Sequence, residues 1–470
     1  MNAPVTLRRV LKFRTVVSTS TGLAYAAISF LGCVQLASLV GGDSGWIAIV
    51  IAGALAVLAA LCFSELNSLY PSAAGVRQYM KASFNENFSL IVTFGYMLTV
   101  IVVIAADSYI VGSAITYTFN LPNWASLIWI LALLGLAMGA NLRGIKITGL
   151  LQDITTYSLL AFAIGISLIA LAKNGFQVHN PFDALFHPDA LVNAVAVGVF
   201  VFSAFEWVTP LSEEIADIRL IPRGMFIALA LLGISYALFT LAAGALLNVH
   251  SPAIFNSPIP QMLLSKAALG QVGIWLMLLA TLLTAVMTFN GGFATASRFL
   301  YAAAREDTLP QLFARISVAF AVPYFAVIFL AASSAAIAVI IFLTGQFNVL
   351  ILFGAVLEAL IYTVAGLCVL RLRRKQPDAE RSFRIKGGWT IPVLTIIIFG
   401  ALAILASLGI GSNILPGLPL IISIGVFLIS TLYVLLVVPR LKAAAQARRA
   451  TTRRRRPVRE ATSTETTGQG

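Results

Sequence analysis

The chain has 470 residues, of which 59% are hydrophobic and only 10% are charged. A soluble globular protein carries about 25% charged residues, so composition excludes a water-soluble fold. The apolar runs are continuous, unlike the weak alternating segments of about ten residues that are typical of membrane β-barrels. The net charge of +13 is spread between the apolar runs and does not form one basic face, so we expect no nucleic-acid partner. We expect an all-α polytopic membrane protein embedded in a lipid bilayer.

A membrane-spanning helix needs about 20 apolar residues, and twelve runs of suitable length can be read along the chain. A cytoplasmic N-terminus is expected at 1–15. No short apolar region with a cleavage site precedes the first run, so we expect the mature protein to begin at Met1. The predicted spans are 16–40, 46–69, 88–118, 123–140, 148–172, 190–216, 225–248, 271–298, 321–344, 347–370, 389–410 and 413–438.

The distribution of basic residues predicts the orientation of these spans. With a cytoplasmic N-terminus, 29 of the 31 Lys and Arg residues fall on the cytoplasmic side, and only Lys173 and Lys266 fall outside. Cytoplasmic loops carry an excess of Lys and Arg, so both termini are expected inside. The basic tail at 441–470 is rich in Ala, Arg and Thr, and its low apolar content predicts disorder. It could bind anionic lipid headgroups, but a solvated tail is the preferred interpretation.

Three carboxylic acids lie near the middle of predicted spans: Asp107, Glu206 and Glu358. Ionisable side chains at this depth are costly and by default mark function. No Lys or Arg occurs at comparable depth to pair with them. Either the carboxyls are protonated, because desolvation disfavours the charged form, or they face a cavity that admits H+, Na+ or a substrate ammonium group. A protonated carboxyl hydrogen-bonded between helices is the structural alternative.

Two spans carry signals of a broken helix. In the sixth, Pro210 lacks the N–H that would bond the carbonyl of Glu206, so the helix should kink or break there. In the first, Ser20 or Thr21 could cap a half-helix beginning near Gly22, with its positive end facing an anion such as a carboxylate. A simple proline kink and close helix packing are the respective alternatives.

Other chemistries find little support in the sequence. All three histidines lie in predicted external loops, and all three cysteines lie inside apolar runs, so we expect no metal site. We find no catalytic motif such as GxSxG or HExxH, no phosphate-binding loop and no extramembrane domain large enough for a catalytic site. We expect neither an enzyme nor a bound cofactor.

Five groups of residues resemble, in order and spacing, motifs of the amino acid-polyamine-organocation superfamily, specifically bacterial amino acid permeases. The resemblance covers nearly the whole chain. The groups are Ser20-Thr21-Gly22-Leu23; Ser64-Glu65-Leu66 with Tyr70 to Gly75; Asn141, Gly144, Gly149 and Gln152; Phe205-Glu206, Glu213-Glu214 and Ile221 to Gly224; and Ser297-Arg298 with Tyr301 to Pro310.

The resemblance implies a leucine-transporter-like fold. Two inverted five-helix repeats, at 16–172 and 190–370, would be followed by two additional helices at 389–438. The substrate would lie between unwound segments of helices 1 and 6 near the membrane midplane, and alternating access would move one bundle against the other.

Carried over residue by residue, the resemblance also implies a binding site. Ser20, Thr21 and Gly22 would meet a substrate carboxylate, whereas Phe202, Ser203, Ala204 and Phe205 would offer carbonyls to its ammonium group and wall the pocket. Glu206 would orient the break and titrate. Ser20 and Ala204 stand where the family commonly has glycine, and the stretch Thr155 to Leu159 lacks the lysine of some proton-coupled relatives.

Asp107 is outside the motifs that carry the resemblance, so it is a candidate for a substrate-binding group particular to this protein. Glu358 is a candidate for coupling or gating, together with Glu206.

The function expected from these features is secondary active transport of amino acids or related amines across the bacterial inner membrane. Symport with H+ or Na+, or exchange, would drive it, because no ATP-hydrolysing machinery is visible. The alternative is a permease-fold sensor that binds amino acids without transporting them and signals through its basic tail. A channel is the third class, disfavoured by a break of the size of a ligand.

Overall fold

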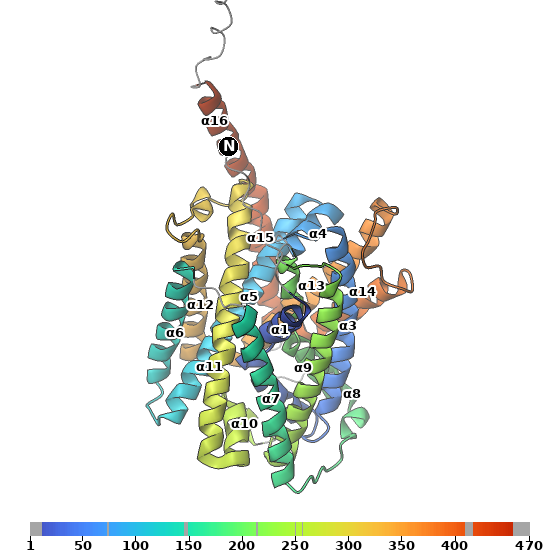
Figure 1. Ribbon diagram of the computed structural model, residues 1–470, viewed down its shortest axis with the longest axis vertical. Helices are drawn as coiled ribbons and strands as arrows, with labels where there is room; N and C mark the ends of the chain where they lie inside the picture. Colours follow the sequence, from blue (N-terminus) through green and yellow to red (C-terminus); the bar gives the residue numbers. More distant parts are fainter. Residues whose placement is uncertain are drawn as a thin grey trace, which may run out of the picture.

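The computed structural model describes residues 12–72, 75–144, 149–212, 215–249, 251–255, 257–408 and 417–454, and these form a helical bundle (Figure 1). Within these ranges, eleven helices are long and apolar enough to cross a membrane, judged by length and composition. A further pair, bent by 60°, raises the number to twelve if it forms one span. The predicted all-helical membrane fold is confirmed at this level.

The helices follow one another with short connections. The first part of the chain forms α1 (Phe13–Ala24), α2 (Ala27–Leu39), α3 (Trp46–Leu69), α4 (Val76–Ser83), α5 (Glu86–Thr118), α6 (Ala125–Leu142) and α7 (Gly149–Lys173). The next forms α8 (Pro188–Val201), the 3₁₀ segment η2 (Phe205–Leu211), α9 (Leu220–Leu246), α10 (Pro252–Phe255), α11 (Pro260–Arg305), α12 (Tyr324–Thr344) and α13 (Phe347–Lys375). The last comprises α14 (Thr390–Leu408), α15 (Leu418–Leu432) and α16 (Val438–Arg454), with a π-helical turn at Tyr433–Val437.

Most predicted spans agree with the helices to within a few residues, and α3 coincides with its prediction. The helix α11 is longer than the predicted span because its first part, 260–269, precedes a break at Gly270, where φ is 62° and ψ is −139°. The short helix α4 was not predicted. It has eight residues and carries Arg77 and Lys81, so hydropathy gives no signal for it.

The C-terminal tail differs from the prediction. Disorder was expected from residue 441, but α16 continues as a helix to Arg454. Two ion pairs hold it against the bundle: Lys442 Nζ lies 2.7 Å from Glu86 Oε2, and Arg449 Nη2 lies 2.6 Å from Asp307 Oδ2. These partners are distant in sequence, so the charge pattern of the tail alone could not indicate them. The expectations for residues 1–11 and 455–470 concern parts of the chain outside the described residues.

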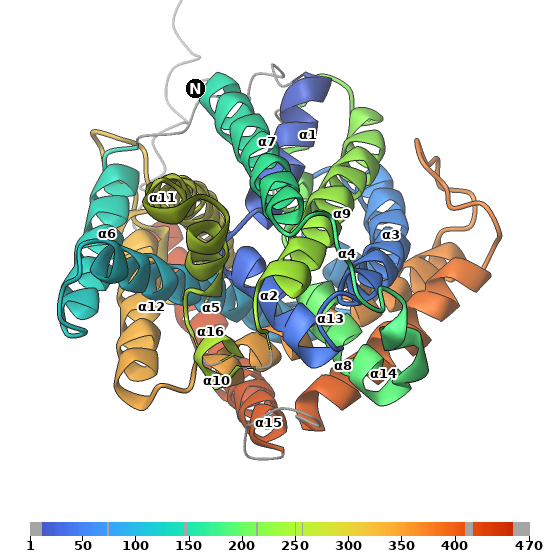
Figure 2. The same ribbon diagram turned by 90° about the horizontal axis from the view of Figure 1, so that it is seen from below.

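The bent pair of helices, α1 and α2, lies at the centre of the bundle. In Figure 2, α2 is seen near the middle, and it packs against α8, α9, α5 and α11. Eleven of its 13 residues are buried. The helices α6 and α12 lie side by side at one edge, and α14 lies at the opposite edge. This arrangement places the broken helices, rather than the peripheral ones, where a site enclosed by protein can form.

Candidate functional site

The first helix is broken at Tyr25 and Ala26, between α1 and α2. Ala26 is extended, with φ −89° and ψ 160°, and has no side chain that could cap the following helix. Asp107 of α5 supplies the cap instead. Its Oδ1 accepts a hydrogen bond from the N–H of Ile28 at 2.9 Å, and its Oδ2 accepts one from the N–H of Ala27 at 3.3 Å. A carboxylate at this position satisfies free N–H groups and faces the positive end of the helix dipole.

The carbonyl groups freed at this break also have partners. The carbonyl of Ala24 accepts hydrogen bonds from the hydroxyl of Tyr236 on α9 at 2.8 Å and from Ser29 Oγ at 3.0 Å. Tyr25 pairs its hydroxyl with that of Ser235, and its ring stacks on Tyr236 with 5.3 Å between the centroids. Unpaired backbone groups are costly in a membrane interior, so these side chains stabilise the unwound residues.

The second break lies in the sixth predicted span, where α8 ends at Val201 and η2 begins at Phe205. Ala204 adopts the left-handed conformation, with φ 72° and ψ 0°. This conformation favours glycine, which has no Cβ, so an alanine here stores some strain. Pro210, where the helix was expected to kink or break, lies inside the 3₁₀ segment η2, and the interruption of the span lies before it. The break itself precedes Glu206 and therefore falls at the residues proposed from the sequence, Phe202 to Phe205.

Two serines connect the breaks to each other. Ser20 Oγ donates to the carbonyl of Phe205 at 2.6 Å, and Ser29 Oγ donates to the carbonyl of Val201 at 3.3 Å. Each serine is on the first broken span and each carbonyl on the second. The two interrupted helices thus form one hydrogen-bonded unit. It is closed to solvent in this conformation, because Ser20 is 0% exposed and Phe205 is 0% exposed.

The half-helix that was predicted to begin near Gly22 begins later in the structure, at Ala27. Ser20, Thr21 and Gly22 lie within continuous α1, and the break begins three residues after Gly22. A Cβ at Gly22 would collide with Met287, Thr156 and Gln152, so the glycine permits close packing there. The hydroxyl of Thr21 is buried without a partner among the described residues. No residue near Ala26 in the sequence signals a cap, because the capping carboxylate, Asp107, comes from α5.

Glu206 and Glu358 form a second buried group, next to the break between α8 and η2. Tyr96 of α5 donates to Glu206 Oε1 at 3.2 Å, and Tyr362 of α13 donates to Glu206 Oε2 at 3.3 Å. Glu358 lies one helical turn before Tyr362, and the carboxyl groups of Glu358 and Glu206 are close enough to repel each other. Both residues are 0% exposed.

The hydrogen bonding of the two glutamates is unequal. Neither oxygen of Glu358 has a hydrogen-bond partner among the described residues. The basic side chains that form ion pairs in the described parts of the chain are bound to other acids. Two unneutralised carboxylates that repel each other are unfavourable in a low-dielectric interior, so this pair needs a proton or a cation. The described residues contain no group of three or more His, Cys, Asp and Glu side chains that could hold a metal ion.

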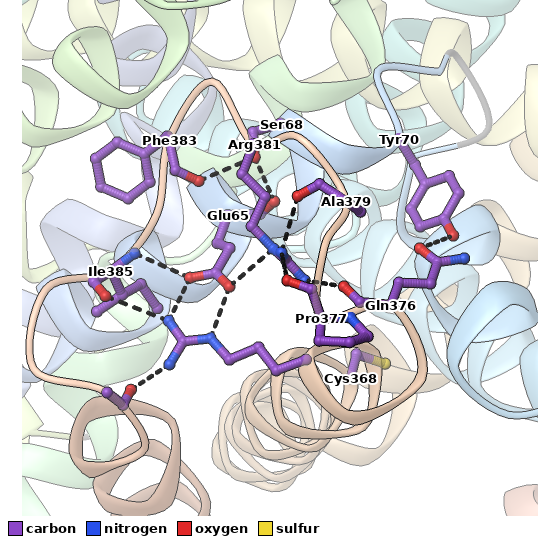
Figure 3. Close-up of polar contacts among 12 residues, drawn as sticks. Glu65, Ser68, Tyr70, Cys368, Gln376, Pro377, Ala379, Arg381, Phe383 and Ile385 are labelled. Carbon is purple, nitrogen blue, oxygen red and sulfur yellow. Dashed lines mark hydrogen bonds and ion pairs between the residues drawn. The ribbon is translucent and has the colours of Figure 1, made fainter.

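Glu65 shows, by contrast, how this fold neutralises a buried acid structurally (Figure 3). It is 1% exposed on α3, and Arg373 binds it with two hydrogen bonds of 2.8 and 2.6 Å. Arg381 forms an ion pair with it at 3.4 Å, and the N–H of Ile385 donates to it at 2.9 Å. This cluster fastens the connection between α13 and α14 to α3. Its carboxylate is neutralised by basic partners, unlike those of Glu206 and Glu358.

Another buried acid, Asp153, links α7 to the first part of α1. Asp153 Oδ2 lies 2.6 Å from Arg14 Nε, and Ser18 donates to Asp153 Oδ1. Thr156, one turn further along α7, donates to the carbonyl of Ser18 at 3.1 Å. These bonds tie the first part of α1 to α7.

Comparison with known proteins identifies the class of this arrangement. The human Asc-type amino acid transporter 1 is 28% identical over 408 residues, covering 80% of this chain and 74% of the relative. The rabbit large neutral amino acids transporter small subunit 2 is 27% identical, covering 76% and 67% of the respective chains. A methylthioribose transporter of Bacillus subtilis is 24% identical, covering 75% and 78%.

A solved structure and a family profile also match this chain. The solved structure of a manganese transporter from Eremococcus coleocola superposes with a TM-score of 0.60 at 16% identity, covering 93% of this chain and 99% of that chain, which shows a shared fold. The profile described as amino acid permease matches residues 11–440. The resemblance found in the sequence is therefore confirmed: the chain belongs to the amino acid permease family of the amino acid-polyamine-organocation superfamily, whose members are multi-pass membrane transporters and not enzymes.

Proposed function

We propose that this protein is a secondary active transporter that carries amino acids or related amines by alternating access, with the substrate bound between the two helix breaks. The observation that carries the proposal is the pair of facing breaks joined by Ser20 and Ser29 at the centre of a transporter bundle. In transporters, interrupted helices supply free backbone groups to substrates near the midplane. Similarity to relatives named for amino acid transport favours amino acids or related amines as substrates.

The proposed architecture is a pair of inverted five-helix repeats, 16–172 and 190–370, with two additional helices at 389–438. The positions of the breaks support this arrangement. One break interrupts the first span and the other the sixth, so each lies in the first helix of its proposed repeat. Successive spans alternate in direction, and spans separated by five therefore run in opposite senses, as an inverted repeat requires.

We propose that both termini are cytoplasmic in a bacterial inner membrane. Lys173 and Lys266, the two basic residues assigned to the outside, lie together at one end of the bundle. Lys173 Nζ bonds the carbonyl of Ala267, and Lys266 Nζ bonds the hydroxyl of Tyr117. The other end carries the pairs between Arg77 and Glu306 and between Lys442 and Glu86. This asymmetry agrees with the positive-inside rule.

The substrate-binding residues in this proposal are grouped around the breaks. Phe202, Ser203, Ala204 and Phe205 wall the site on the sixth span, and Asp107 faces it from α5. Ser20 acts through its bond to the Phe205 carbonyl. Thr21, one helical turn before the break at Tyr25, supplies a hydroxyl that has no partner among the described residues. Gly22 contributes the close approach of α1 to α7 and α11 rather than a direct contact.

Glu206 and Glu358 are the proposed coupling groups, and H+ is the proposed coupling ion. The groups facing Glu206 are Tyr96 from α5 and Tyr362 and Glu358 from α13. Phenol groups can pass hydrogen bonds as a proton moves, whereas a bound Na+ would need a cage of oxygen ligands. Because Glu206 belongs to the broken span, its protonation state can bias the geometry of the break.

The test uses the purified full-length protein in proteoliposomes. Uptake and exchange of radiolabelled amino acids and amines are measured under an inward H+ gradient, under a Na+ gradient and with unlabelled substrate inside. We expect saturable uptake, accelerated by the H+ gradient. Glu206→Gln should abolish H+-driven accumulation while exchange continues, and Glu380→Gln, in an exposed loop, is the matched control.

Contrary results have distinct meanings. Uptake driven only by Na+ would refute the H+ assignment. Binding, seen as a rise in melting temperature, without uptake or exchange would refute transport and favour the sensor alternative. Absence of both binding and transport for every compound in the panel would refute the proposed substrate class.

A further inference from the structure

Asp107 occupies the place where transporters with interrupted helices hold the anionic group of a substrate. The first N–H groups of a half-helix attract anions because they are unpaired and carry the positive end of the dipole. Here the N–H groups of Ala27 and Ile28, which begin α2, are bonded to the two oxygens of Asp107. Asp107 is 0% exposed and comes from α5, so the chain itself supplies the anion.

A second carboxylate at this break would meet an occupied site. It would compete with Asp107 for the same N–H groups and would be repelled by a carboxylate at hydrogen-bonding range. No Lys, Arg or His in the described parts of the chain forms an ion pair with Asp107 to offset that repulsion. An amino acid could not place its carboxylate here without displacing Asp107 from α2.

The groups beside Asp107 point to a cation instead. Thr288 of α11 is 1% exposed, and its hydroxyl faces Asp107 and forms no hydrogen bond within its own helix among the described residues. The neighbouring threonines of that helix face differ, because Thr281 and Thr284 bond carbonyls of their own helix at 2.7 and 2.8 Å. A hydroxyl that faces a carboxylate can donate its hydrogen to that carboxylate and still accept a hydrogen bond from an ammonium group.

Aromatic rings complete the surroundings. Tyr236 interacts electrostatically with Asp107, stacks on Tyr25 and meets the ring of Phe202 edge-on with 5.6 Å between the centroids. Ring faces attract cations, and their apolar area suits a hydrocarbon chain. A carboxylate has about four acceptor positions, of which the two N–H groups take two, so Asp107 can still bind an ammonium group.

We infer that Asp107 replaces the carboxylate of the substrate at the first helix break, so that the site takes organic ammonium compounds lacking an α-carboxylate. The chemical class is that of the primary amines formed when amino acids lose their carboxyl group. This inference rests on the proposed transport function and narrows its substrate from amino acids and amines to amines.

Matched pairs of compounds test the inference in the full-length protein in detergent. Phenethylamine is compared with phenylalanine, isoamylamine with leucine and cadaverine with lysine, by calorimetric titration. We expect the preferred amine to bind at least about tenfold more tightly than its parent amino acid. Asp107→Asn should remove that preference, because the neutral amide cannot pair with the ammonium group. Asp43→Asn, which also alters a buried acid, is the control and should leave the preference unchanged.

The outcomes separate this inference from the proposed function. Equal or tighter binding of the amino acid in the wild-type protein, together with its transport in proteoliposomes, would overturn the inference and leave the transporter proposal in place. Binding of neither member of any pair, with no transport, would overturn both. If Asp107→Asn fails to fold, the wild-type comparison within each pair still decides, and Thr288→Val provides a second variant that should weaken amine binding selectively.

Discussion

Replacing Glu65 by alanine should destabilise the protein measurably, because Glu65 is the ion-pair partner of two buried arginines. The side chains of Arg373 and Arg381 are 6% and 2% exposed, and Glu65 itself is 1% exposed. Removing one partner of a buried ion pair costs about 3–5 kcal/mol, since the remaining charge stays unpaired. Arg373 would keep its bonds to the carbonyls of Gly388 and Ile385, so we expect the lower end of that range, about 3 kcal/mol.

The assay is thermal unfolding of the detergent-purified protein. The entropy of unfolding is about 2.1 cal/mol/K per residue, so a chain of 470 residues shifts by about 1 °C per kcal/mol, and Glu65→Ala should melt about 3 °C lower. Glu65→Gln, which keeps hydrogen-bond acceptors, should fall between it and the wild type. The control is Glu380→Ala, an exposed acid in the same connection as Arg381. Equal melting temperatures for Glu65→Ala and Glu380→Ala would refute the argument that the cluster in Figure 3 fastens this connection.

Three further substitutions test the site. Gly22→Ala should reduce transport and cost about 1–3 kcal/mol of stability, because the added Cβ would collide with Met287, Thr156 and Gln152. The control is Gly135→Ala, because Gly135 has open space around it. Similar melting curves for the two variants would contradict the explanation by close packing. Ser20→Ala removes the bond to the Phe205 carbonyl and should weaken substrate binding in titrations, with stability lower by about 1 kcal/mol, unlike Ser38→Ala, which affects only its own helix. Asp153→Asn loses its ion pair with Arg14 and should loosen the contact between α1 and α7, seen as faster labelling of a cysteine placed at the buried Thr19. Unchanged labelling would contradict a role for Asp153 in holding this contact.

The spans were predictable because each is a long apolar run, and α3 illustrates how closely hydropathy alone follows a helix. The short helix α4 and the extension of α16 were not, because their stability comes from contacts with remote residues. Glu86 holds Lys442, and Asp307 holds Arg449, across more than a hundred residues of sequence. The local composition indicates only that such a segment is polar, and it cannot identify the remote residue that stabilises the helix.

A disruption of the sixth span was predictable from its sequence, although its position before Glu206 was not, and neither was the position of the first break. Pro210 marked a disruption through a local rule, since a residue without an N–H disturbs its own helix. The first span contains no proline or capping residue that would indicate where its break lies. Ser20 and Thr21 have the chemistry of caps, but Ser20 bonds the opposite break and both stay within α1. The true cap, Asp107, lies about 80 residues away and becomes recognisable only when α5 is placed beside α2.

The buried acids fall into two groups, those with and those without an arginine partner, and this difference supports the proposed function. Glu65 and Asp153 have arginine partners, and both fasten helices together near one end of the bundle. Asp107, Glu206 and Glu358 lie deeper and are held by backbone N–H groups, by phenols, or by nothing among the described residues. A structural acid would gain stability from a basic partner, and the same chain shows that it can provide one. Their lack of such partners in this fold is explained if each must exchange its neutralising group, a proton or an ammonium ion, during the transport cycle.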